Sequence, residues 1–296
     1  MKVQAYPDFV CPLDGLPLEV IADGAQCSAG HHFDRAREGY LNLLPVQHKA
    51  SRQPGDDQAM VAARRRVLDS GVFALLADAV FEIVGAMVSP SAESRPLRVV
   101  DAGCGEGYYL ARLINAARAC GGRGALSLAG FDISKFAVRA AARRSDAVAW
   151  AVASNRQPPF PLASIDVILS LFGFPQWEAF EGVLARGGCV LLVEAGADHL
   201  LELRELIYPQ VERHHPPLPH AAMARGWRVR HERAIQYRVD LNTPAEIAAL
   251  LVMTPHAHRA THQGRAALAS LPNLSTTVSA VLRVMESPTL TPAGKS

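Results

Sequence analysis

An acid followed by three alternating glycines is the part of this 296-residue chain best suited to chemistry. Asp101 ends an apolar run, and Gly103, Gly105 and Gly107 follow it. The apolar run is typical of a buried parallel strand, and residues 108–118 are typical of a helix. Glycines between them would let backbone N–H groups approach a ligand, because no side chain holds the backbone away. The stretch predicts a nucleotide-cofactor crevice, although plain packing of strand against helix also favours glycine.

The spacing of these glycines differs from the G-x-G-x-x-G of dinucleotide-binding proteins. It resembles the D-x-G-x-G-x-G motif of class I S-adenosylmethionine-dependent methyltransferases, which implies S-adenosylmethionine as the cofactor. Asp132 is expected at the end of the next strand, where a carboxylate can accept hydrogen bonds from ribose hydroxyls. The third strand ends near Ser154, where the adenine is expected. We therefore predict as cofactor-binding residues Asp101, Gly103, Gly105, Glu106, Gly107, Asp132 and Ser154.

Alternating strands and helices must hold these residues, and the pattern predicts an α/β fold. Strands are expected at residues 97–101, 126–132, 148–153, 165–171 and 189–194. Helices are expected at 58–68, 72–88, 108–118, 134–144, 176–185, 198–208 and 243–253, and further strands at 227–241 and 276–285. The predicted fold class is a Rossmann-like class I methyltransferase sheet, doubly wound and mostly parallel, preceded by a small zinc-finger-like module.

The composition sets limits on the class of protein. A net charge of +2 and a pI near 8.3 do not by themselves indicate a nucleic-acid partner. Five scattered cysteines, an odd number, argue against a disulfide framework and for a reducing compartment. The longest apolar stretch contains Asp78 and Glu82, and residues 1–10 lack the features of a signal peptide. We expect a cytoplasmic protein without a membrane partner.

The first 48 residues contain a candidate metal site. Cys11, Cys27 and His31 are three zinc-binding side chains, and Asp14 occupies the position that would complete a C-x2-C knuckle. Because so short a segment buries little apolar surface, a metal would stabilise it. The alternative is a former zinc site that now folds by packing onto its neighbour.

A longer set of motifs carries a more specific resemblance. The run E-G-Y-x-N-L-L-P-V-Q over residues 38–47, together with the Cys11, Cys27 and His31 positions, resembles the bacterial 23S rRNA (guanine-N1)-methyltransferases. The resemblance continues through residues 54–56, 63–65, 101–109 and 253–255 and covers about residues 9–285. It implies methylation of N1 of a guanine in a hairpin loop of 23S rRNA. It also implies that Phe73 stacks on the cofactor and that His199 contacts it. The family usually carries cysteine where this chain has Asp14.

The resemblance also suggests a division of the chain. We expect a zinc-knuckle-like RNA-recognition module at 1–48, a helical linker at 49–96, a methyltransferase domain at 97–286 and a disordered tail at 287–296. Five basic residues around the linker are candidates for phosphate contact, although a solvated helix face is the simpler explanation for any one of them. They are Lys49, Arg52, Arg64, Arg65 and Arg66.

N1 lies on the Watson–Crick edge of guanine, which a duplex hides, so the substrate must be a loop or a flipped base. The resemblance implies that the partner is a hairpin loop of 23S rRNA. A homodimer is a further expectation. No residue of the sequence identifies itself as the base that removes the N1 proton. Two alternatives stay open: a small-molecule methyltransferase on the same fold, and a non-catalytic protein that binds RNA or cofactor.

Overall fold

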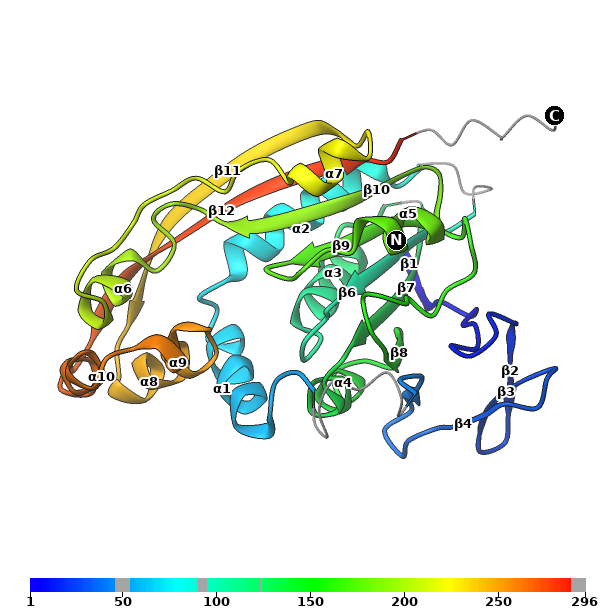
Figure 1. The fold of residues 1–296 in the computed structure, drawn as a ribbon, viewed down its shortest axis with the longest axis horizontal. Helices are drawn as coiled ribbons and strands as arrows, with labels where there is room; N and C mark the ends of the chain where they lie inside the picture. Colours follow the sequence, from blue (N-terminus) through cyan, green and yellow to red (C-terminus); the bar gives the residue numbers. More distant parts are fainter. Residues whose placement is uncertain (46–53, 90–94, 123, 289–296) are drawn as a thin grey trace.

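A computed structural model describes residues 1–45, 54–89, 95–122 and 124–288 (Figure 1). A nine-stranded sheet forms its centre, with the order β11-β12-β10-β9-β6-β7-β8-β5 and with β1 paired to β7. The strands that carry the crevice are β6 (Leu97–Ala102), β7 (Ala125–Asp132), β8 (Ala149–Val152), β9 (Ile165–Leu171) and β10 (Leu184–Ala195). These five are parallel to one another. The predicted fold class is confirmed.

The strand order places a switch point at the end of β6. From β6 the chain builds β7 and β8 on one side, and it then crosses to build β9 and β10 on the other. A ligand crevice forms where the direction of winding reverses, outside the carboxyl ends of the strands. The glycine turn that follows β6 lies at this point.

Alternation along each strand separates two cores, because successive side chains point to opposite faces of a sheet. Val99 packs into the first core and Val100 into the second. The first core is covered by α2 (Ala74–Met87), α3 (Tyr108–Ala119) and α4 (Lys135–Ala142). The second is covered by α5 (Trp177–Val183), α7 (His220–Ala224) and residues from the N-terminal segment.

The C-terminal part extends the sheet with two long antiparallel strands, β11 (Arg228–Leu241) and β12 (Leu274–Glu286). Four helices gather near one end of this ribbon (Figure 1): α6 (Leu201–Ile207), α8 (Pro244–Val252), α9 (His256–Arg259) and α10 (His262–Ala269). Helix α1 (Gln58–Asp69) packs against both α8 and α4. It therefore joins the C-terminal helices to the helices of the sheet.

The N-terminal segment forms a small antiparallel sheet of β2 (Leu18–Ile21), β3 (Gly24–Cys27) and β4 (His32–Asp34). In Figure 1 this sheet lies at the end of the molecule opposite to α10. Strands on either side of it join the large sheet: β1 (Lys2–Ala5) pairs with β7, and β5 (Leu41–Asn42) pairs with β8. The module is thus tied to the large sheet at both of its ends.

Most expected elements are present, and the differences have local causes. The helix expected at 198–208 begins only at Leu201, because Leu200 takes a left-handed conformation with φ of 51°. The helix expected at 176–185 ends at Val183, and β10 begins there before the turn at Gly187 interrupts its register. Strands β1 to β5 and helices α7, α9 and α10 were not predicted. Within the described residues, no helix is long and apolar enough to cross a membrane.

Candidate functional site

The glycine turn has a left-handed backbone at each of its three glycines. Gly103, Gly105 and Gly107 have φ angles of 83°, 55° and 83°. The three positions differ in what a side chain would meet. A Cβ on Gly107 would lie 2.9 Å from the Trp150 ring and 3.0 Å from Ala141, so this glycine serves packing. A Cβ on Gly103 would meet no atom within 4 Å, and one on Gly105 would meet only the Arg64 side chain at 3.6 Å. These two positions form an open cradle that side chains would fill.

Asp132 ends β7 and faces this turn. Its carboxylate accepts hydrogen bonds from the backbone N–H groups of Gly105 (3.0 Å) and Ser134 (2.8 Å). Burial raises the pKa of Asp132, and the two N–H donors oppose this rise. Ser134 caps α4 through a hydrogen bond from the Ala137 N–H to its hydroxyl. Asp132 therefore does not cap the helix, and its remaining lone pairs fit the predicted ribose contact.

Asp101 is buried at the end of β6, and both of its carboxylate oxygens lack a hydrogen-bond partner among the described residues. Burial, reinforced by the charge of Asp132, raises its pKa to about 8. A buried polar group without a partner is costly and calls for a ligand or an ion. S-adenosylmethionine carries an ammonium and a sulfonium, so its charges fit this carboxyl group. The orphaned oxygens and the open cradle together fit the predicted cofactor.

Glu106 lies in the same turn, but the structure gives it a partner within the protein. Its fully buried side chain forms an ion pair with Arg144, which also donates from Nε to the Glu106 carbonyl oxygen at 3.0 Å. The Arg144 guanidinium additionally reaches Asp69 at 2.9 Å. This arrangement ties the glycine turn to the end of α1. The cofactor contact of Glu106 stays a prediction.

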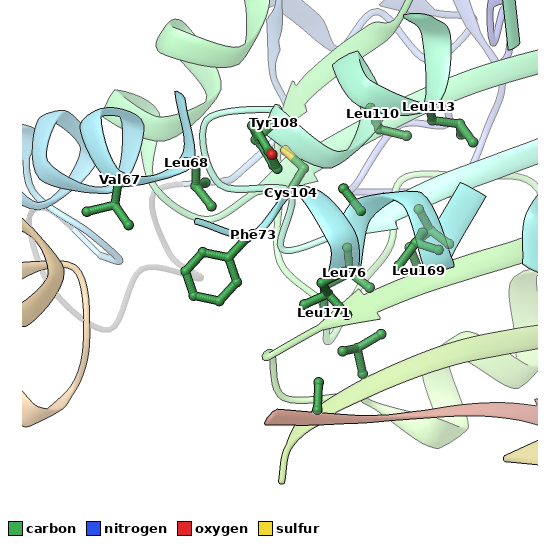
Figure 2. Packing of buried hydrophobic residues seen from close by; sticks show 14 of the residues in the cluster. Val67, Leu68, Phe73, Leu76, Cys104, Tyr108, Leu110, Leu113, Leu169 and Leu171 are labelled. Atoms are coloured by element: carbon green, nitrogen blue, oxygen red, sulfur yellow. The ribbon is translucent and has the colours of Figure 1, made fainter. Parts of the chain in front are cut away.

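An aromatic cluster stands at the β9 side of the crevice. Phe73 lies at the start of α2 and is buried in the first core beside Leu68 and Leu171, as Figure 2 shows. Its ring centroid is 6.0 Å from that of His199 and 6.3 Å from that of Phe172. The structure thus brings together the two residues assigned by resemblance. Sequence reasoning missed Phe172, whose φ of 53° turns the chain just after β9.

His199 is held as a neutral imidazole. Its Nδ1 lies 2.8 Å from the Ser279 carbonyl oxygen, to which it donates a hydrogen bond. Burial lowers the pKa of His199 to about 4, so the ring is uncharged near pH 7. The same residue lines a cavity of about 520 Å³ together with Tyr208, His256 and Arg259. Tyr208 Oη and His256 Nδ1 are 2.8 Å apart. This cavity adjoins the aromatic cluster through His199.

Ser154 and the basic residues predicted to contact RNA do not gather at one place in the structure. Ser154 follows β8 and forms a turn in which its hydroxyl accepts from the Arg156 N–H at 3.2 Å. Lys49 and Arg52 lie outside the described residues. Arg65 is exposed and pairs with Asp69 at 3.4 Å, and Arg66 is also exposed. Arg64 instead points toward the glycine turn. The predicted contact of these residues with RNA stays a prediction.

The four candidate metal ligands converge in the N-terminal module. Two tight turns bring them together, with Gly15 and Gly30 in left-handed conformations. All four ligand atoms lie within 4.8 Å of one another. His31 Nδ1 is 3.5 Å from the sulfur atoms of Cys11 and Cys27, and Asp14 Oδ2 is 3.3 Å from Cys27 Sγ. The candidate ligand set is Cys11, Asp14, Cys27 and His31.

These distances and donor types fit a tetrahedral Zn²⁺ with two sulfur, one nitrogen and one oxygen ligand. Burial raises the pKa of Cys11 to about 11, and the Leu13 N–H, 3.4 Å from Cys11 Sγ, opposes this rise. The Leu16 N–H lowers the pKa of Asp14 to about 2, which keeps this ligand ionised. The zinc site is supported over the alternative of a former site, because the fourth position still supplies a ligand.

Two family models match stretches of this chain. A family model described as RlmA, N-terminal, a zinc ribbon, matches residues 9–52. A model described as methyltransferase domain matches residues 99–191. Among solved structures, a type II methyltransferase, provisionally named, from Anaeromyxobacter dehalogenans has a TM-score of 0.46 and 18% identity, covering 72% of this chain and 96% of its own.

Relatives of similar length carry a more specific name. A protein from Micromonospora griseorubida, provisionally named a 23S rRNA (guanine-N1)-methyltransferase, is 36% identical over 69% of this chain and 70% of its own length. A Bacillus subtilis protein with the same provisional name is 31% identical over 68% of each chain. The 23S rRNA (guanine(748)-N1)-methyltransferase of Streptomyces fradiae is 34% identical over 65% of each. With its zinc ribbon, its glycine turn and these relatives, the chain belongs to the family of 23S rRNA (guanine-N1)-methyltransferases.

Proposed function

We propose that this protein transfers a methyl group from S-adenosylmethionine to N1 of a guanine in a hairpin loop of 23S rRNA. The observation that carries the proposal is the presence, in one chain, of the zinc ribbon and of a methyltransferase crevice with an orphaned acid at its base. The names of the relatives supply the substrate, and the geometry supplies a place for the cofactor.

The residues of the chain would act mainly by alignment. S-adenosylmethionine, when bound, supplies an electrophilic methyl group. Methyl transfer of this kind disperses positive charge, so it depends more on orientation and dehydration than on a strong acid. Asp132 would hold the ribose, and the Phe73, Phe172 and His199 rings would exclude water from the reacting end. A neutral His199 adds no positive charge that would repel the cofactor's sulfonium.

The substrate base would enter beside these rings. N1 is accessible only when the guanine is unpaired, in a loop or flipped from a stack. The cavity lined by His199, Tyr208 and His256 adjoins the aromatic cluster, which supports this route of entry. The guanine N1 proton would leave to a base or to solvent. The N-terminal module and the basic residues near α1 are the surfaces proposed to hold the rRNA, and a homodimer stays a prediction.

The test uses a bacterial host that lacks the family enzyme. The wild-type chain and Gly103→Val are expressed separately, and 23S rRNA is then isolated and digested to nucleosides. We expect N1-methylguanosine only with the wild type, because a branched side chain at Gly103 fills the cradle. Reverse transcriptase should stop one nucleotide before a single guanine, since N1 methylation blocks Watson–Crick pairing. The position of that stop identifies the guanine, for comparison with guanine 748 of the Streptomyces relative.

Identical stops and nucleoside profiles with and without the wild-type chain would contradict the proposal. If labelled methyl groups from S-adenosylmethionine then appeared in a small molecule of the lysate, the alternative of a small-molecule methyltransferase would replace it.

A further inference from the structure

Arg64 extends from α1 over the glycine turn, and 28% of its side chain remains exposed. Its Nε and Nη2 donate to Asp56 Oδ2 at 3.2 and 2.6 Å, and Nη2 also reaches the Met253 carbonyl oxygen at 3.3 Å. Its Cδ lies 3.6 Å from the place of a Cβ on Gly105. The side chain therefore packs directly on the open part of the glycine turn.

One nitrogen of this guanidinium is left for a ligand. Among the described residues, no hydrogen bond uses Arg64 Nη1. A guanidinium presents five N–H donors in a fixed fork, and a carboxylate is the group that matches this fork best. Asp56 and the Met253 carbonyl hold the other donors and so fix the orientation of the group. Arg64 is preorganised to bind an additional anion at the glycine turn.

The order of sites along the sheet indicates which anion that is. Adenine is expected at the end of β8 and ribose at Asp132, at the end of the neighbouring β7. The next strand in that direction is β6, where the glycine turn and Asp101 lie. The part of the cofactor beyond the ribose is an amino acid with one ammonium and one carboxylate. The buried oxygens of Asp101 suit the positive groups of the cofactor, which leaves its carboxylate in need of a cation.

We propose that Arg64 binds the carboxylate of the methionine part of S-adenosylmethionine and thereby positions the cofactor. This inference rests on the proposed function and deepens it, since it assigns to the cofactor a residue that the sequence had suggested for RNA. Arg65 and Arg66, the next two residues of the helix, lie on its exposed side and remain candidates for phosphate contact. Adjacent arginines would thus serve two different ligands.

The test compares two cofactors that differ only in the carboxylate. Affinities for S-adenosylmethionine and for its decarboxylated analogue are measured by calorimetry on the wild type, Arg64→Gln, Arg64→Lys and the matched control Arg65→Gln. A hydrogen bond to a charged group corresponds to roughly a tenfold to hundredfold difference in affinity. We expect Arg64→Gln to lower the affinity for S-adenosylmethionine by this factor and to leave the affinity for the decarboxylated analogue unchanged. Arg64→Lys should fall between, and Arg65→Gln should bind both ligands like the wild type.

The analogue reports whether the crevice survives the substitution, because Arg64 also contacts Asp56 and Met253. An equal loss for both ligands would show that Arg64 acts only on the structure of the site and would overturn the inference. Unchanged affinity for S-adenosylmethionine, with weakened binding of an rRNA hairpin, would overturn it in favour of an RNA contact.

Failure of the proposed function gives a different result. If the wild type binds neither cofactor, the methyltransferase assignment itself is wrong. If the wild type binds S-adenosylmethionine and its decarboxylated analogue equally well, the assignment stands and the role of Arg64 is wrong.

Discussion

Replacement of Arg144 by alanine should destabilise the protein strongly through Glu106. The Glu106 side chain has no exposed surface, and that of Arg144 is 12% exposed. Without Arg144, the buried Glu106 carboxylate loses its counter-charge. The backbone carbonyl oxygen of Glu106 also loses its hydrogen-bond donor. Breaking a buried ion pair in this way costs about 3–5 kcal/mol. At about 2–4 °C per kcal/mol for a chain of this size, Tm should fall by roughly 6–20 °C.

The effect should also depend on pH, which separates it from a loss of packing. Burial raises the pKa of Glu106, and the ion pair with Arg144 opposes this rise. Removal of Arg144 lets the pKa of Glu106 in the folded state rise further, so the folded protein keeps the Glu106 proton to a higher pH than the unfolded chain does. The free energy of unfolding therefore falls as pH rises from the pKa of Glu106 in the unfolded chain toward its pKa in the folded protein. The deficit of Arg144→Ala relative to wild type should therefore grow between about pH 4 and pH 7.

Thermal unfolding by circular dichroism at several pH values is the assay, and the neighbouring Arg143→Ala is the control. Arg143 is 54% exposed and pairs with Glu38 at the surface, where ion pairs contribute little. Adding Glu106→Gln to Arg144→Ala should recover part of the loss, because the buried charge is gone. Equal Tm shifts for the two arginine variants, or a deficit that does not change with pH, would refute the reasoning.

Three further predictions concern the other parts of the site. Asp14→Cys should slow the release of zinc to a chromophoric chelator, because a thiolate replaces a carboxylate; an unchanged release rate would argue that Asp14 is not a ligand. Gly107→Ala should lower Tm more than Gly103→Ala, since the Cβ added at position 107 would lie 2.9 Å from Trp150. A larger fall in Tm for Gly103→Ala would contradict the conclusion that Gly107 is the glycine required for packing. His199→Gln should flatten the dependence of the free energy of unfolding on pH between about pH 6.5 and 4. A lowered histidine pKa contributes stability that is lost as pH falls through this range, and the variant lacks this contribution. If chemical unfolding at several pH values gave the same pH dependence for both proteins, the result would count against a buried neutral ring.

The elements of the parallel sheet were predictable because their signals are local. Apolar runs of strand length, glycine turns and helix caps each involve residues within a few positions of one another. The caps illustrate this: Asp57 accepts a hydrogen bond from the Met60 N–H three residues on, and Thr243 forms a capping box with Glu246, also three residues on. The glycine turn and Asp132 were found for the same reason, since each follows directly from the end of a strand.

The missed parts depend on contacts between distant positions. Strand β1 exists because it pairs with β7, more than 120 residues away, and four exposed or half-buried residues give it little pattern of its own. Phe172 completes the aromatic cluster only because β9 ends beside the start of α2. Arg144 had no special sequence context, yet it holds Glu106, 38 residues earlier, in the glycine turn. Side-chain partners of this kind cannot be read from spacing.

Arg64 shows how such contacts alter the meaning of a motif. In the sequence, the three successive arginines are candidates for the same phosphate contact, although a helix distributes neighbouring residues over most of its circumference. The fold separates them: Ser134, next but one to Asp132, donates to the Asp56 carbonyl oxygen at 2.6 Å, and Asp56 in turn holds Arg64. Asp56, which directly precedes the cap of α1, is thereby fixed against the end of β7. A change in the position of Asp56 would therefore move Arg64 at the glycine turn, which links the start of α1 to the site expected to hold the cofactor.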